Sequence, residues 1–417
     1  MTVAPATTAL RVRTRPLRID GPLLDVLPEG SGALSWVRGG EGVVGWGEAA
    51  RFTTSGPERF AEADRWWRSV VDACSTRDEI RLPGTGPVAF ASFTFDDASP
   101  GSVLVVPRVV VGRRGHRAWI TEISPASEPE TAPELPVPSP VRPDGRLRYA
   151  DGQVSSHRYR AAVTEAVGRL RAGTLDKVVL AHDLLVHAED PLDARFLLHG
   201  LAARYPTCWS FAVDGLVGAT PELLLRLDGR TVESRVLAGT MWPDSEGLTA
   251  AEIGGTLFAS AKDRREHAYA VDSLAASLAP LVCDLQVPEA PQVLTLPNVS
   301  HLASDVRARL DPARPASLLT LTGAVHPTAA VGGTPTPDAT ALITEIEGLD
   351  RGRYAGPVGW VDAGGGGEMG LALRCAELDG RTARLFAGCG IVADSDPDSE
   401  VREAAAKMRA VREALEG

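Results

Sequence analysis

The sequence predicts a mixed α/β fold that combines amphipathic helices with antiparallel hairpins. Apolar side chains recur at helical spacing over residues 157–171, and Gly173 is placed to end that helix. Asp228-Gly229 separates two apolar runs, which favours a tight β-hairpin. The chain has 417 residues, 44% of them hydrophobic, so it can bury a large core. Length alone allows one large unit or two or three smaller ones.

Local signals place the remaining elements. Strands over 88–95 and 102–111 are expected to surround one amphipathic helix in the N-terminal third. The last helix begins at Asp396-Pro397, a capping residue followed by proline at the first helical position, and runs to about residue 415. Between these ends we expect a helix over 262–278 and strands over 177–180, 209–217, 223–227, 231–237, 358–362, 371–377 and 385–392.

A proline-rich segment divides the sequence. Residues 124–143 contain seven prolines with glutamates between them, a composition that excludes a helix or a central strand. We therefore separate an N-terminal part, 1–123, which is mostly strands, from a linker or surface excursion at 124–149. The third part, 150–417, holds every candidate for chemistry. Composition alone favours two domains, with the N-terminal third as scaffold.

Charge and cysteine content narrow the class of protein. The net charge of −11 argues against a nucleic-acid or anionic-membrane surface, so an anionic substrate would need local cations or a metal. No signal peptide is expected at the N-terminus, and no stretch approaches the roughly 20 apolar residues of a membrane helix. Five scattered cysteines without a C-x-x-C pair argue against disulfides or a zinc cluster, so we expect a cytoplasmic protein.

The C-terminal helix carries Glu400, Glu403 and Lys407 on one face, away from its apolar stripe. Two carboxylates one turn apart can bind a hard cation such as magnesium, and the lysine could hold an anionic substrate. Glu266, on a second helix, could complete the site, because magnesium usually takes only one or two protein carboxylates. A solvated helix face with ordinary Glu–Lys pairs would show the same spacing.

Lys177 and Glu222 are candidates for acid–base chemistry. Lys177 begins an apolar strand, where it either reaches solvent or points into a site. To act as a base it must be neutral, which costs about 4.6 kcal/mol at pH 7 unless burial or nearby cations lower its pKa. Glu222 lies just before a hairpin strand and could act as an acid if desolvated. Structural roles remain the alternative for both.

Other motifs exclude common classes of site. Gly365, Gly367 and Gly370 match G-x-G-x-x-G, but the match joins two strands and opens no helix, which excludes a dinucleotide site. No G-x-S-x-G motif and no P-loop occurs. His301 is either a site residue or a partly buried histidine with satisfied ring nitrogens.

Taken together, these residues resemble the chorismate-utilising enzymes, the family of isochorismate, salicylate, anthranilate and aminodeoxychorismate synthases. Family members commonly have arginine where this chain has His182, which we expect to alter packing or a local ion pair and not the chemistry. The resemblance covers about residues 150–415 strongly and the N-terminal third weakly. The matching segments, in family order, are 176–180, 218–223, 237–240, 262–267, 301–302, 326–328, 350–356, 373–376, 387–392 and 400–407.

The resemblance implies one α/β unit with two stacked antiparallel sheets and helices packed outside. It implies that Lys177 activates water and that Glu222 protonates the departing hydroxyl. Glu266 and Glu403 would bind Mg²⁺, with Glu400 and, as a further candidate, Asp263 acting directly or through water. The pocket that holds chorismate would include Thr240, His301, Ala330, Tyr354, Arg374, Gly388 and Lys407.

The resemblance also selects a reaction. Most aminating members draw ammonia from a glutaminase subunit or fused domain, and no glutaminase segment is fused here. Aminating and salicylate-forming members typically carry threonine where this chain has Ala330, so isochorismate synthase is the expected activity. Salicylate synthase, an aminating enzyme and a non-catalytic binding protein are the alternatives. The expected partner is chorismate alone, without an obligate protein partner, and the product could serve menaquinone or siderophore biosynthesis.

Overall fold

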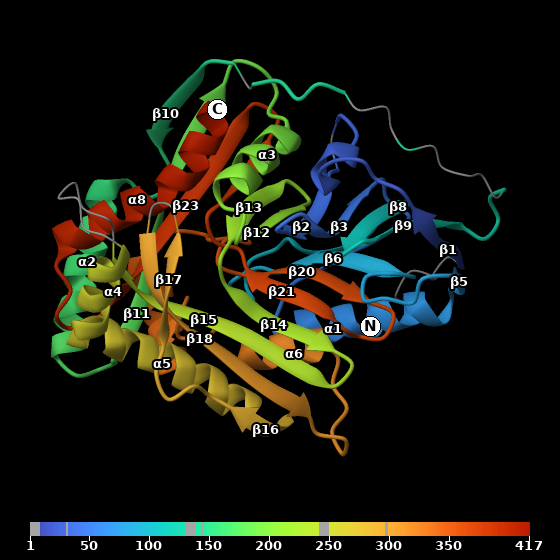
Figure 1. Cartoon of the computed structure of the whole chain (residues 1–417). Helices are drawn as coiled ribbons and strands as arrows, with labels where there is room; N and C mark the ends of the chain where they lie inside the picture. Colours follow the sequence, from blue (N-terminus) through green and yellow to red (C-terminus); the bar gives the residue numbers. More distant parts are fainter. Residues whose placement is uncertain are drawn as a thin grey trace.

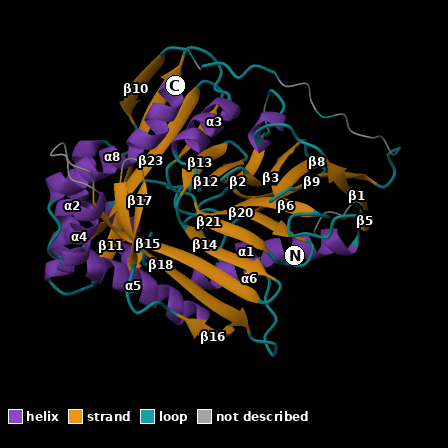
Figure 2. Ribbon diagram, viewed as in Figure 1, coloured by secondary structure: helices purple, strands orange, loops and turns teal. Residues whose placement is uncertain are grey.

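The computed structural model describes residues 9–30, 32–129, 135, 139–143, 145–241, 250–296 and 299–417. Within these residues the chain forms eight α-helices and two large β-sheets (Figure 1, Figure 2). The predicted mixed α/β class and two-sheet architecture are confirmed. The strand pairs are antiparallel, except for one parallel pair at the edge of the larger sheet.

The larger sheet contains thirteen of the described strands. Its spatial order is β10 (Leu147–Asp151), β11 (Lys177–Ala188), β23 (Thr382–Ile391), β22 (Cys375–Asp379), β13 (Leu216–Thr220), β12 (Trp209–Val213), β2 (Leu34–Arg38), β3 (Glu41–Trp46), β8 (Val109–Arg114), β9 (Arg117–Pro125), β1 (Leu10–Leu17) and β5 (Ser75–Asp78), with β19 (Gly333–Thr334) beside β11. The parallel pair is β1 with β5.

The smaller sheet contains ten of the described strands. Its order is β16 (Val282–Gln286), β18 (Val299–Leu310), β15 (Thr231–Met241), β14 (Leu223–Asp228), β21 (Gly367–Leu371), β20 (Pro357–Asp362), β6 (Val88–Ser92), β7 (Ser102–Val106) and β4 (Ala50–Thr54), with β17 (Gln292–Leu296) beside β18. One hydrophobic core includes residues from both sheets, among them Trp36, Phe90 and Trp360.

The helices cover the sheets, as Figure 2 shows. They are α1 (Arg59–Asp72), α2 (Ser156–Arg171), α3 (Ala194–Arg204), α4 (Ala250–Ala259), α5 (Ala261–Leu278), α6 (Leu318–Val325), α7 (Thr336–Ile346) and α8 (Pro397–Glu416), with a short 3-10 turn at Leu23–Val26. Helix α5 packs on β15 and α8 packs on β23. Among the helices of the described residues, none is long and apolar enough to cross a membrane.

Side-chain caps explain where α2, α5 and α8 begin. The Ser155 side chain accepts from a backbone N–H in the first turn of α2, and Ser260 does the same for α5. Asp396 accepts from the Ser399 N–H and is followed by proline in the first turn of α8, as predicted. Because these signals are local, the predicted helices 157–171, 262–278 and 396–415 agree closely with the structure.

Three of the predicted strands each cover parts of two separate strands in the structure. Residues 102–111 form β7 and β8, which belong to different sheets, because the chain crosses between the sheets at Pro107 and Arg108. Residues 209–217 form the β12–β13 hairpin, with the turn at Asp214 and Gly215, both at positive φ. Residues 371–377 contain the end of β21 and the start of β22, again in different sheets.

The N-terminal strands lie inside both sheets. Strand β2 pairs with β12 in the larger sheet, and β6 pairs with β20 in the smaller one. The described residues between 126 and 146 form no helix or strand, in agreement with the proline content. The proline-rich segment therefore separates stretches of sequence that contribute strands to the same two sheets.

Candidate active site

One polar pocket collects residues from segments that are far apart in the sequence. The space between its lining side chains, including its opening to solvent, is about 610 Å³. Nine of the twelve predicted site residues line it: Glu222, Thr240, Glu266, His301, Ala330, Tyr354, Arg374, Gly388 and Lys407. The other three adjoin it, because Lys177 contacts Glu266 and because Glu400 and Glu403 lie on α8 with Lys407.

Lys177 is completely buried at the start of β11 and does not reach solvent. Its Nζ lies 3.2 Å from Oε1 of Glu266, which α5 supplies. Burial alone would raise the pKa of Glu266, but Lys177 and two further lysines hold it below its usual value. A Cβ at Gly390 of β23 would collide with the Glu266 carboxylate and with the Lys177 side chain. Glycine at 390 therefore permits this buried pair.

Glu222 lies between β13 and β14 and is 5% exposed. Its backbone N–H donates to Thr220 Oγ1 over 3.2 Å, and its carbonyl accepts from Leu371 N–H over 3.3 Å. Burial raises the pKa of the Glu222 carboxyl group to about 8, although a backbone N–H of Leu237 and the charge of Lys177 oppose the shift. The side chain is thus a neutral acid at pH 7.

Arg374 is positioned through His301. The arginine lies where the chain crosses from β21 to β22, in the left-handed region at φ 49°. Its Nη2 lies 3.4 Å from His301 Nε2, and His301 Nδ1 lies 3.2 Å from Thr240 Oγ1. Burial, with the charges of Arg374 and Lys407, holds the pKa of His301 well below its usual value. A neutral His301 can therefore accept from Arg374 while its Nδ1–H points toward Thr240.

Thr240 is aimed into the pocket by an irregular strand. The β15–β18 ladder shifts register between Ala238 and Thr240, and Gly239 there has φ 75°. Such a bulge re-aims the side chain that follows it. The Asp263 carboxylate accepts a hydrogen bond from the Thr240 N–H, while burial raises its pKa. This places Asp263 behind the bulge as a support for Thr240.

Helix α8 supplies a buried charged face. Lys407 Nζ lies 2.9 Å from the Gly388 carbonyl oxygen and 2.7 Å from Glu403 Oε1. Burial opposes its charge, but Cys389 and Glu403 hold the pKa of Lys407 above its usual range. Glu400 is 2% exposed, and burial together with Glu403 raises its pKa. A solvated helix face is therefore the wrong interpretation of this spacing.

Comparisons with known proteins agree with this geometry. The model of a family described as chorismate binding enzyme matches residues 36–416. The chain belongs to the chorismate-binding enzyme family. The match begins inside β2, so the family includes most of the N-terminal third, where the sequence motifs showed only a weak resemblance.

Several named relatives of this chain are isochorismate synthases. The salicylate biosynthesis isochorismate synthase of Pseudomonas aeruginosa is 34% identical, over 89% of this chain and 82% of its own length. The isochorismate synthase MenF of Bacillus subtilis is 31% identical, over 90% and 85%. The solved structure of MenF, the menaquinone-specific isochorismate synthase from Escherichia coli, has a TM-score of 0.81 and 26% identity, and covers 99% of this chain and 96% of its own.

The side chains near α8 fit the magnesium that this family resemblance implies. Oxygen donors suit a hard cation, and Glu266, Glu400 and Glu403 each supply a carboxylate. The three carboxylates lie near one another, because all of them raise the pKa of the same lysine, Lys262. Ligand atoms of Cys389, Glu400 and Glu403 lie within 4.8 Å of one another. A thiol is a soft ligand and does not suit magnesium, so the carboxylates are the candidates.

One residue of the pocket wall, Arg351, was not predicted as a site residue from the sequence. Arg351, within the 350–356 motif, lines the pocket and forms a buried ion pair with Glu347 at 2.6 Å. It also donates to the carbonyl oxygens of Val331 and Val179 over 2.9 and 2.7 Å. Arg351 therefore ties together the backbone that carries Ala330. Arg351 lies within a motif that the sequence analysis identified, but only its contacts in the structure show that it supports the pocket wall.

Two other predicted site residues form part of the pocket wall. The Tyr354 ring stacks on Phe386 with a centroid distance of 5.0 Å, and burial raises the pKa of its hydroxyl. Ala330 is half-buried and presents a methyl group to the pocket.

His182, the departure from the family pattern, stacks on Tyr159 with a centroid distance of 4.7 Å, and burial lowers the pKa of its imidazole. His182 therefore affects packing, which is one of the two effects predicted for it from the sequence.

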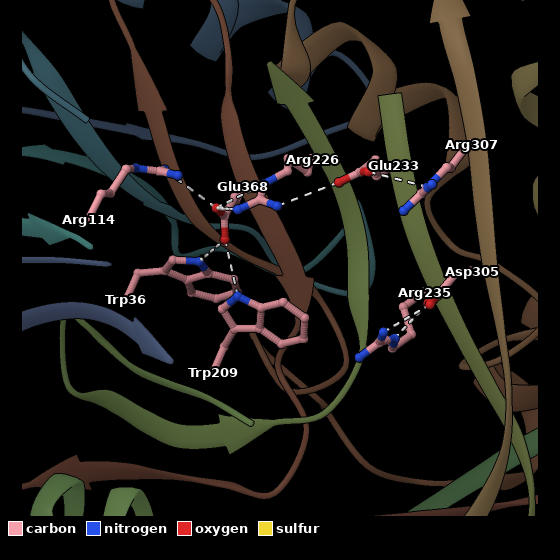
Figure 3. Close-up of polar contacts among 9 residues, drawn as sticks. All are labelled: Trp36, Arg114, Trp209, Arg226, Glu233, Arg235, Asp305, Arg307 and Glu368. Atoms are coloured by element: carbon pink, nitrogen blue, oxygen red, sulfur yellow. Dashed lines mark hydrogen bonds and ion pairs between the residues drawn. The ribbon is translucent and has the colours of Figure 1, made fainter. Parts of the chain in front are cut away.

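A larger cavity of about 870 Å³ lies elsewhere and offers different chemistry. In it Glu368 accepts from the indole N–H groups of Trp36 and Trp209, over 2.8 and 3.1 Å, and pairs with Arg226 at 2.7 Å (Figure 3). Further ion pairs extend across the smaller sheet, joining Arg226 and Arg307 to Glu233, and Arg235 to Asp305. These charges are largely satisfied by one another, so we place the chemistry in the smaller pocket.

Proposed function

We propose that this protein is a magnesium-dependent isochorismate synthase. The observation that carries the proposal is the meeting, in and beside one pocket, of a neutral buried carboxyl group, a buried lysine and two cations. Glu222 is the acid, Lys177 is the candidate base, and Arg374 and Lys407 provide positive charge. An isomerisation that adds one hydroxyl and removes another needs these groups together. The named relatives support the same activity.

The cations would hold the two carboxylates of chorismate. Arg374 offers a planar fork with paired N–H donors, and its guanidinium is positioned by His301. Lys407 offers a point charge that its neighbours keep protonated. Magnesium, held by Glu266 and Glu403 with Glu400 acting directly or through water, would offset substrate charge and orient the ring.

Proton transfers would be divided between Lys177 and Glu222. Lys177, which pairs as a cation with Glu266 in this structure, would first lose its proton and then take one from a water molecule, whose oxygen bonds to ring carbon 2 as the double bonds shift. The bond between carbon 4 and its hydroxyl breaks, and Glu222 donates a proton so that water leaves. The enolpyruvyl group stays on the ring, so the product is an isomer of the substrate. The buried, protonated state of Glu222 supports its role as the acid.

Product analysis tests the proposal directly. The protein is incubated with chorismate, with and without magnesium, and isochorismate, salicylate and pyruvate are quantified. We expect isochorismate to form only with magnesium, without stoichiometric pyruvate. Stoichiometric salicylate and pyruvate from the wild type would instead assign it to the salicylate synthases.

Glu403→Gln tests the metal assignment. The substitution keeps the shape of the side chain and removes a carboxylate from the group on α8, so we expect the magnesium concentration that gives half-maximal activity to rise at least about tenfold. Glu413→Gln, an exposed change on the same helix, is the matched control and should behave as wild type. Normal activity of Glu403→Gln at low magnesium would remove Glu403 from the ligand set.

Ala330→Thr tests the choice of reaction. The new hydroxyl would lie beside the ring, where it could assist elimination, so we expect pyruvate and salicylate to appear in addition to isochorismate. Ala330→Val has nearly the same volume without the hydroxyl and controls for overpacking, which typically costs about 1–3 kcal/mol. If both variants only turn over more slowly and isochorismate stays the sole product, the residue at position 330 marks the subfamily without controlling the reaction.

A further inference from the structure

The carboxylates proposed to hold the metal are all neutralised by lysines in this structure. Each of these three glutamates has one ammonium group at 3.2 Å or less. The pairs are Glu266 with Lys177 at 3.2 Å, Glu403 with Lys407 at 2.7 Å and Glu400 with Lys262 at 2.9 Å. Three negative charges therefore face three positive charges before any divalent cation arrives.

Lys262 differs from the other two lysines in its access to solvent. Its side chain is 33% exposed, whereas those of Lys177 and Lys407 are 0% and 10% exposed. It lies in the first turn of α5, one turn before Glu266, and reaches across to Glu400 on α8. Lysine has a long flexible stem and a strongly hydrated head, so Lys262 can move into water without opening the core.

The charge of Lys262 acts on the whole carboxylate group. Burial alone would lower its pKa, but Glu400, Glu266 and Glu403 together hold the pKa of Lys262 above its usual value. Glu400 itself is 2% exposed, so loss of its ammonium partner would leave a buried carboxylate beside that of Glu403. A buried charge without a partner is costly, and another cation would relieve that cost.

We propose that Lys262 is the exchangeable cation of the metal-free site and competes with the divalent cation for Glu400. When the divalent cation binds, Lys262 gives up Glu400 and turns to solvent, whereas Lys177 and Lys407 stay in the pocket. Lys262 is thus a positioning residue that sets metal affinity. The inference rests on the proposed magnesium dependence, and it goes beyond it by assigning a role to a lysine outside the ligand set.

The test measures binding of magnesium chloride to the full chain without chorismate, by titration calorimetry and by the change in Tm. We expect Lys262→Met to bind magnesium on the order of tenfold more tightly than wild type, because removal of a competing charge strengthens attraction of a dication. Its Tm without metal should fall, and its Tm should rise more on addition of magnesium. Lys262→Arg should restore the wild-type affinity.

Arg265→Met is the matched control, because it removes a positive charge from α5 at a residue that pairs with exposed Asp394 and not with the site carboxylates. It should leave the magnesium affinity unchanged. If Lys262→Met does not fold, Lys262→Gln serves, since it lacks the charge but can still donate to Glu400. Equal or weaker binding by the neutral variant, with wild type binding normally, overturns competition by Lys262. Absence of magnesium binding in every protein, wild type included, would overturn the metal assignment itself.

Discussion

Glu222→Gln is expected to lower kcat by about 100- to 10,000-fold, the usual contribution of a general acid. Glutamine has the shape of a protonated glutamate but cannot give up a proton to the leaving hydroxyl. Because burial raises the pKa of Glu222 to about 8, the wild-type side chain is already neutral at pH 7. The substitution therefore removes no charge, and the Tm should be equal to or above that of wild type.

The pH dependence provides the second readout for Glu222. The acid form is the active one, so kcat/KM of the wild type should fall as pH rises through about 8. The pKa of Glu222 is higher in the folded protein than in the unfolded chain. Between these two pKa values, the folded protein therefore binds more protons than the unfolded chain. Wild-type stability therefore falls across that range as pH rises, and Glu222→Gln should not show this loss. If Glu222→Gln keeps activity within tenfold of wild type, Glu222 has a structural role and is not the general acid.

Lys177→Met is expected to reduce kcat by a similar factor of about 100 to 10,000, because the base that takes the proton from water is removed. Methionine is unbranched and fits a site that is 0% exposed. The change also leaves Glu266 without its nearest cation, 3.2 Å away in the wild type. Breaking a buried ion pair typically costs about 3–5 kcal/mol, so the Tm should fall as well.

A double variant separates the two effects of losing Lys177. Lys177→Met combined with Glu266→Gln removes both members of the pair, and should recover much of the lost Tm, since no buried charge is left unpaired. Its activity should be no higher than that of Lys177→Met, because the base is absent and a proposed magnesium ligand, Glu266, is lost as well. Recovery of activity together with the Tm would show that Lys177 acts only by neutralising Glu266, and not as the base.

Local sequence signals predicted α2, α5 and α8 and the hairpin at Asp228-Gly229, whereas α3, α4, α6 and α7 were not predicted. Apolar spacing with a serine cap defines α2, and Asp396 followed by Pro397 defines the start of α8. Each signal lies within a few residues of the structure that it specifies. The motifs also identified the side chains around the pocket, because residue type and order along the chain were enough to show the family resemblance.

Only the tertiary structure decided how distant segments pair. Backbone hydrogen bonds carry no residue code, so the sequence did not indicate that β2 would pair with β12, or that 102–111 would divide between two sheets. The chemistry of the site depends on the same long-range packing. Burial makes Glu222 a neutral acid, and it brings Lys262 to Glu400, 138 residues away in the sequence. A pKa or an ion pair depends on solvent exclusion and on neighbours that the completed fold alone supplies.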